Sequence, residues 1–387
     1  MKKIVLLNIL VAFTVLFICC VNSQNKQSLN PTIKVPDGKN EILLLSDISS
    51  EIEFIVLEEN ANSFFDYISD FKSVDSLFFF IGNRNLSLFC FKNTGEFVFK
   101  INQIGRGPGE YTTITDYAVD KSRSVVSLYD INLRKFFEFD FSGKLLREVK
   151  TNWFFREIEW IDEGFLGYAT SEYNYFNSKK ILPGLILLDT LYNYAEHVQA
   201  LDDPTGVIIK NSLFYNNGQI FFNPFWESVI YKIENKKLLE YKRFDFGKAE
   251  IADKEKYKAG QYSLENLKEE GKAMSTGTFV ESKHFSILLE SFGVLSNLYF
   301  FKENSATLFG RIIINDLVGP VGLNLIGVDQ TGVLFYDPEN PIPTDEEWIK
   351  NFKRNHGTPP GKELHEKFDK ISYLGGKIAN NVIVKIK

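Results

Sequence analysis

Two stretches of the chain repeat each other: FCFKNTGEFVFKI at residues 89–101 and FEFDFSGKLLREV at residues 137–149. They align without a gap, so that 48 positions separate Gly95 from Gly143. In each copy the glycine lies between two short apolar runs, and glycine readily adopts the positive φ that a tight hairpin turn needs. Each stretch is therefore predicted to be a β-hairpin, and the pair predicts an internal repeat.

One period of this repeat contains only strands. Between the two hairpins, residues 114–119 and 125–129 are apolar runs joined by a polar turn at residues 120–124. Four short strands without a helix are the content of one propeller blade. Degraded copies continue along the chain, at residues 185–189 with 194–198, 229–233 with 238–244, and 298–301 with 306–311.

The number of blades follows from the length. Residues 249–274 are rich in Lys, Glu, Ala and Leu, and residues 344–369 begin with a capping-box spacing, so both are predicted to be helical inserts. Without them, about 300 residues remain, enough for about six blades, with five or seven as the nearest alternatives. The sequence thus predicts an all-β, six-bladed β-propeller with four-stranded antiparallel blades. We expect residues 53–58 to pair with residues 382–386 and to close the ring.

The composition fits a globular sheet protein. Of 387 residues, 44% are hydrophobic and 15% aromatic, with 36 Phe and 17 Tyr. The net charge is −6 and no Lys/Arg-rich run occurs, so a nucleic-acid partner is not expected. We expect a monomer that needs no cofactor.

The first residues have the layout of a secretory signal peptide. Lys2 and Lys3 precede an apolar run from residue 4 to residue 18, and then come Cys19, Cys20 and a polar stretch. This resembles a bacterial lipoprotein signal. The sequence predicts a signal peptide at residues 1–20, a lipid on Cys20, a flexible linker at residues 21–38 and one propeller domain at residues 39–387. Lipidation at Cys19, or an ordinary signal peptide with two incidental cysteines, remains an alternative; the third cysteine, Cys90, is predicted to be a buried core residue.

A family resemblance rests on further residues. They are the octapeptide IGRGPGEY at residues 104–111, Asp120, residues 129–130, residues 139–144 and the last seven residues. With these, the chain resembles a family of six-bladed β-propeller lipoproteins of Gram-negative, Bacteroides-type bacteria and is more distantly similar to NHL repeats. Asn380 and Asn381 stand where that family commonly has Asn-Pro. The resemblance implies architecture and a lipid-anchored location in the cell envelope, at the outer membrane and facing either the periplasm or the surface; it implies no reaction.

The glycine-rich octapeptide allows two interpretations. Its glycines invite a phosphate-loop interpretation, but the Gly-Lys-Ser/Thr ending is missing and strands flank it on both sides. The simpler interpretation is a structural link between the first two blades. The alternative is a ligand site at the funnel or its rim, formed by Arg106, Glu110 and Tyr111.

Catalytic and metal motifs are scarce. No Gly-x-Ser-x-Gly pentapeptide occurs, and the four histidines are too scattered for a zinc site, so no metal is expected. The sequence segments 202–206 and 329–332 are predicted to be turns. Aromatic clusters at residues 153–155 and 173–176 suit core packing, or alternatively stacking on a sugar or peptide ligand.

Three functional hypotheses remain open. The first is a cell-envelope binding or scaffold module for a glycan, peptide or protein partner. The second is an envelope lyase or hydrolase that uses the central funnel, and the third is a subunit of a nutrient-uptake complex. Converging charged side chains in the funnel would favour the enzyme, whereas an apolar and amide lining would argue against it.

Overall fold

The computed structural model describes most of the chain in separate ranges. These are residues 32–35, 42–49, 51–161, 164–170, 173–201, 212–224, 226–247, 253, 255–256, 261, 272, 278–283, 286–292, 295–302, 305–310, 312–315, 321–336 and 382–387. The predicted signal peptide, the second helical insert and all but isolated positions of the first insert lie outside these ranges.

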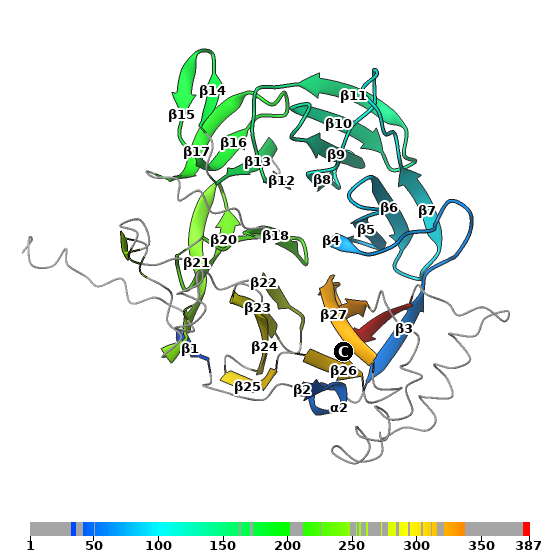
Figure 1. Cartoon of the computed structure of the whole chain (residues 1–387), viewed down its shortest axis with the longest axis vertical. Helices are drawn as coiled ribbons and strands as arrows, with labels where there is room; N and C mark the ends of the chain where they lie inside the picture. The colour runs from blue at the N-terminus through cyan, green and yellow to red at the C-terminus, as the bar shows by residue number, and fades with distance from the viewer. Residues whose placement is uncertain are drawn as a thin grey trace, which may run out of the picture.

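The described strands form six blades of four antiparallel strands around a central axis (Figure 1), which confirms the six-bladed propeller. The first three blades are β4 (Ser69–Val74), β5 (Leu77–Gly82), β6 (Ser87–Lys92) and β7 (Phe97–Ile101); β8 (Asp116–Asp120), β9 (Val125–Asp130), β10 (Lys135–Asp140) and β11 (Leu145–Lys150); and β12 (Glu157–Ile161), β13 (Gly164–Ala169), β16 (Gly184–Leu188) and β17 (Tyr194–Ala200). A hairpin of β14 (Asn174–Phe176) and β15 (Lys179–Ile181) projects from the third blade.

The other three blades follow the same order. They are β18 (Leu213–Asn216), β19 (Gln219–Phe222), β20 (Val229–Glu234) and β21 (Lys237–Asp245); β22 (Thr278–Glu281), β23 (Ser286–Phe292), β24 (Leu295–Lys302) and β25 (Ser305–Gly310); and β27 (Val321–Val328), β28 (Val333–Tyr336), β29 (Val382–Ile386) and β3 (Ile52–Val56). The first strand of each blade lies nearest the axis (Figure 1).

The ring closes in the sixth blade as predicted. β3, from the amino-terminal part of the chain, pairs antiparallel with β29, so that Ile55 lies opposite Ile383. This closure leaves no open gap between the last blade and the first, and it protects the strand edges there.

The chain before β3 adds strands to two blades. β1 (Thr32–Lys34) pairs parallel with β21, and β2 (Ile42–Leu44) pairs parallel with β26 (Ile312–Asn315), which in turn pairs with β27. The short helix α2 (Leu45–Ile48) follows and buries Leu45 and Ile48. β1 thus begins inside the stretch that the sequence assigns to a linker.

The two repeated stretches are the outer hairpins of the first two blades. Gly95 and Gly143 have φ angles of +95° and +79°, as the turn prediction requires. At Gly95 space is also limiting, because a Cβ atom would lie 2.0 Å from the carbonyl oxygen of Val56. Glycine here lets the chain leaving β3 pass against the first blade.

Aromatic side chains fill the blades and the spaces between them. Phe78, Phe80, Phe89 and Phe91 are fully buried, and the Phe80 ring stacks on Phe89 with centroids 5.5 Å apart. Cys90 is buried and free, as predicted, and burial raises the pKa of its thiol to about 12. Within the described ranges, no helix has the length and apolar character to cross a membrane.

Candidate functional site

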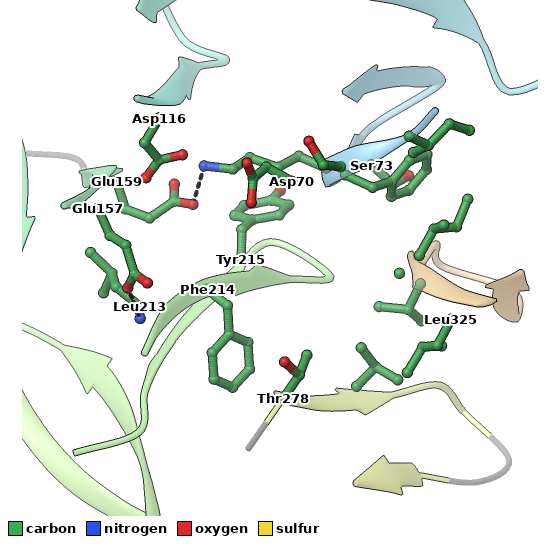
Figure 2. Close-up of a pocket in the computed structure, with 18 of the residues that line it drawn as sticks. Asp70, Ser73, Asp116, Glu157, Glu159, Leu213, Phe214, Tyr215, Thr278 and Leu325 are labelled. Atoms are coloured by element: carbon green, nitrogen blue, oxygen red, sulfur yellow. Dashed lines mark hydrogen bonds and ion pairs between the residues drawn. The ribbon is translucent and has the colours of Figure 1, made fainter. Parts of the chain in front are cut away.

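The six innermost strands enclose a cavity of about 330 Å3 on the propeller axis (Figure 2). Side chains alternate between the two faces of a strand, so neighbouring residues of an inner strand point to different surroundings. The cavity-lining residues that carry charge are Asp70, Lys72, Asp116, Arg156, Glu157 and Glu159, and all of them come from β4, β8, β12 or the residue before β12. The charged part of the cavity wall therefore comes from three consecutive blades.

Lys72 connects these three blades at the axis. Its Nζ donates to the carbonyl oxygen of Tyr117 at 2.5 Å and forms an ion pair with Glu159. The side chains of both ion-pair partners are almost fully buried. Burial disfavours the charged amine, but Glu159 and Asp116 outweigh burial and raise the pKa of Lys72, so this lysine remains a cation.

Asp116 is held by the backbone of the next blade. One of its oxygens accepts the N–H of Ile158 at 2.6 Å, and the other accepts the N–H of Tyr117 at 2.7 Å. Burial raises the pKa of Asp116 to about 7; Lys72 opposes this effect, and the neighbouring carboxylates Asp70 and Glu159 add to it. The Asp116 carboxyl group therefore keeps its proton to a higher pH than an exposed aspartate does.

Glu157 of the third blade is held in the same way, by backbone N–H groups at the start of the fourth blade. Its two oxygens accept the backbone N–H groups of Ser212 at 3.1 Å and Leu213 at 2.5 Å, beside and on β18. Burial raises its pKa to about 8, although these backbone hydrogen bonds favour the ionised form. Glu157 and Asp116 are therefore both fixed in position, and burial raises the pKa of both.

Two further charged groups complete the polar wall. Asp70 has a φ of +48°, and the pairing of β4 with β5 shifts register between Ser69 and Lys72, so β4 is bulged at this point. Bulges of this kind re-aim side chains beside functional sites. The guanidinium of Arg156 lies 5.0 Å from the centre of the Phe154 ring, and its Nε has no hydrogen-bond partner among the described residues.

The opposite wall is mainly apolar. It is formed by β22 and β27, with Thr278, Val280, Leu325 and Val328 facing the cavity. Gly327 also belongs to this wall, and it has no room for a side chain because a Cβ atom there would lie 2.6 Å from the Phe71 ring. Figure 2 shows Asp116, Glu157 and Glu159 on one side of the cavity and Leu325 on the other.

A wider hollow of about 840 Å3 lies at the carboxyl ends of the inner strands. Ser73 and Tyr215 line both this wider hollow and the central cavity, so the two spaces adjoin there. Burial, helped by Glu159 and Asp75, raises the pKa of Tyr215 to about 12. The Tyr215 phenol is therefore neutral at the border between the two spaces.

The residues that the sequence proposed as a ligand site lie elsewhere. Arg106 is exposed, Glu110 accepts the N–H of Gly107 at 2.8 Å, and Tyr111 is fully buried. The Tyr111 hydroxyl has the carbonyl oxygens of Leu86 and Ile101 at 2.9 and 3.1 Å. None of the three lines the central cavity. Their geometry is that of a link between the first two blades, and a ligand-binding role for them stays a prediction.

The other sequence candidates divide in a similar way. Trp153 is buried and donates to the carbonyl of Tyr192 at 2.8 Å, whereas 56% of Tyr175 is exposed on the β14–β15 hairpin. Asp329 accepts the N–H groups of Thr331 and Gly332, so the turn predicted at residues 329–332 is confirmed, whereas residues 202–206 lie outside the described ranges. Among the described residues, no group of three His, Cys, Asp or Glu side chains is arranged to hold a metal ion.

Sequence reasoning did not select the cavity carboxylates. The available signal was local: Glu157 and Glu159 flank the apolar Ile158, which places both carboxylates on one face of a strand. A polar face on a strand next to the axis is the mark of a funnel residue. Nothing in the sequence alone says which strand of a blade lies next to the axis.

Comparisons with known proteins agree with the fold. The model of a domain of unknown function, DUF4934, matches residues 30–387. No curated protein matches the chain. A Bacteroides fragilis protein described as exported is similar in structure, with a TM-score of 0.68 and 16% identity over 92% of this chain and 99% of that one. A DUF4221 member from Bacteroides vulgatus has a TM-score of 0.46 and 8% identity over 87% and 96% of the two chains. At 16% identity, the first likeness shows the fold alone.

Proposed function

The chain belongs to the DUF4934 family, and we propose that it is a ligand-binding protein of the bacterial cell envelope that holds its ligand in the central cavity. The observation that carries this proposal is the cavity itself. Inner strands from all six blades line it, and it contains charged side chains in fixed positions. Pre-formed concave sites with a few placed polar groups are typical of small-molecule binding.

The rigidity of the polar wall supports binding. Asp116 and Glu157 each accept two backbone N–H bonds, and Lys72 is held between a carboxylate and a carbonyl. Side chains that are already fixed lose little conformational entropy when a ligand arrives. A glycan unit, a peptide end or another small envelope molecule is the kind of ligand that such a wall suits.

A thermal-shift screen tests the cavity. The mature protein is tested against envelope and dietary glycans and short peptides, because a bound ligand raises the melting temperature. Thr278→Phe fills the cavity from β22, and Arg106→Ala removes the exposed link residue as the matched control. We expect stabilising compounds to lose their effect in Thr278→Phe and to keep it in Arg106→Ala. Loss of the effect in Arg106→Ala but not in Thr278→Phe would place the binding site at the link instead.

The envelope location is the second element of the proposal. The charged and apolar amino terminus with Cys19 and Cys20 supports a lipoprotein, and β1 starts only a short distance after these cysteines. The protein would then stand close to the membrane, on the periplasmic or the surface side. We also propose that the repeat is distantly related to NHL repeats.

Paired cysteine variants test the anchor. Cys20→Ala should move the protein from the membrane fraction to the soluble fraction, whereas Cys19→Ala should stay with the membrane. If Cys19→Ala alone released the protein from the membrane, Cys19 would be the lipidated residue. Membrane retention of both variants would refute the lipid anchor.

A second candidate function is acid–base catalysis in the same cavity. The pKa values of about 7 and 8 for Asp116 and Glu157 favour it, because a carboxyl group poised near the working pH can donate or accept a proton. Lyase and hydrolase assays on uronate polysaccharides and aryl glycosides test it. Turnover that disappears in both Asp116→Asn and Glu157→Gln would establish the enzyme, and binding without turnover would favour the binding protein.

A further inference from the structure

The two walls of the central cavity differ in chemistry, and the following inference about the ligand rests on the proposed function. β4, β8 and β12, with Arg156 just before β12, supply carboxyl groups and two cations, whereas β22 and β27 supply mostly aliphatic side chains. The polar and the apolar groups face each other across the cavity (Figure 2). A ligand that fills the space therefore presents a polar group to one wall and an apolar body to the other.

Carboxyl groups outnumber cations on the polar wall. Four carboxyl groups line the cavity, but Lys72 is already engaged by Glu159 and by the Tyr117 carbonyl. Arg156, the other cation of the wall, lies over the ring of Phe154. The described cavity wall thus carries four carboxyl groups and two cations.

We infer that the cavity binds the ammonium group of an amphipathic amine, with the ammonium beside Asp116 and Glu157 and the apolar body against β22 and β27. Backbone N–H groups already orient both carboxyls. Each carboxylate still has lone pairs that can accept N–H bonds from an ammonium group. We place the entry of the ligand at the wider hollow, which shares Ser73 and Tyr215 with the central cavity.

Binding of such a cation is coupled to proton release. Burial keeps protons on Asp116 and Glu157 up to about pH 7 and 8, and an adjacent ammonium favours the ionised carboxylates. The charged and titratable groups that face these two carboxyls are Asp70 and Lys72 on β4, Tyr117 on β8, Arg156 before β12, Glu159 on β12, Tyr168 on β13 and Tyr215 on β18. An amine with a pKa near 10 stays charged, so its affinity should rise at least about tenfold between about pH 6 and about pH 8.5.

Calorimetric titration of the mature protein with three matched probes tests the inference. The probes are 2-phenylethylammonium, 3-phenylpropionate and 2-phenylethanol, which present a cation, an anion and a neutral hydroxyl on the same ring. We expect the amine to bind at least about tenfold more tightly than either partner at about pH 8. Titrations in buffers of different ionisation enthalpy should show net proton release with the amine alone; proton uptake or no proton exchange would contradict the inference.

Variants locate the effect. Glu157→Gln and Asp116→Asn should each weaken amine binding at least about fivefold, and Glu196→Gln, an exposed carboxylate on β17, should leave it unchanged. If neither cavity variant folds, the wild-type probe order and proton release decide alone. Tighter binding of 3-phenylpropionate that is lost in Thr278→Phe would overturn the ammonium inference and leave the proposed site standing. Failure of all three probes would also overturn the inference, while the glycan and peptide screen decides separately on the proposed function.

Discussion

The glycine-rich link at residues 104–111 and the inner segment at residues 156–159 are both polar, yet their polar groups have different environments. In the link, Glu110 accepts an N–H from its own turn, and the Tyr111 hydroxyl lies between carbonyl oxygens of the first blade. These groups are satisfied inside the protein. Such groups hold the fold together and leave little for a ligand.

The inner segment lines the central cavity instead. Glu157 and Glu159 line the cavity, and burial raises the pKa of both carboxyl groups. Glu159 already pairs with Lys72, whereas backbone N–H groups hold Glu157, so Glu157 is the carboxyl group of this segment that a cation from outside can approach. The comparison separates a polar segment that stabilises the ring from one that can recognise a ligand, and three experiments test this separation.

The largest expected effect is the loss of the buried ion pair at the axis. Lys72→Met leaves Glu159 buried without its cation and should lower the free energy of unfolding by about 3–5 kcal/mol, measured by urea denaturation. Adding Glu159→Leu should recover some of this loss. Lys92→Met breaks the exposed pair with Glu96 and should cost at most about 1 kcal/mol. Equal losses of unfolding free energy in Lys72→Met and Lys92→Met would show that the buried ion pair at the axis contributes no more to stability than an exposed one.

A smaller effect should appear in the pH dependence of stability. Asp116 and Glu157 bind protons more tightly in the folded protein than in the unfolded chain, so they stabilise the fold at low pH. That contribution is lost as the pH rises from about 4 to about 8, with a slope of at most about 1.4 kcal/mol per pH unit for each group. Glu157→Gln should flatten the slope between about pH 5 and about pH 8 in urea titrations. An unchanged slope would mean that Glu157 is ionised throughout.

The smallest effect should come from the link. Tyr111→Phe removes a buried hydroxyl near two carbonyl groups and should cost about 1–2 kcal/mol of stability in the same urea assay. Ligand affinity should be unchanged, because Tyr111 does not line the cavity. A variant of normal stability with weakened ligand binding would return the ligand site to the link.

The fold was largely predictable because its signals are local. The turn glycines Gly95 and Gly143, the apolar runs around them and the closure of β3 on β29 could all be inferred from short stretches and their spacing. The parallel pairing of β1 with β21 could not, because a three-residue strand carries little pattern of its own. Its partner lies about two hundred residues away, and only the ring geometry brings the two together.

The cavity residues were harder to predict because they, too, are far apart in the sequence. Lys72, Asp116 and Glu157 come from three different blades, and no short motif contains them. The octapeptide at residues 104–111 attracted attention because its residues are contiguous and its composition is unusual. A contiguous glycine-rich motif reports the geometry of a turn more directly than it reports a binding site.

A crystal structure of the mature protein with the most stabilising compound of the screen tests the central claim most directly. The cavity account predicts electron density for the compound between the carboxyls of Asp116 and Glu157 and the aliphatic wall at Leu325. Density beside Arg106 with an empty cavity would contradict it.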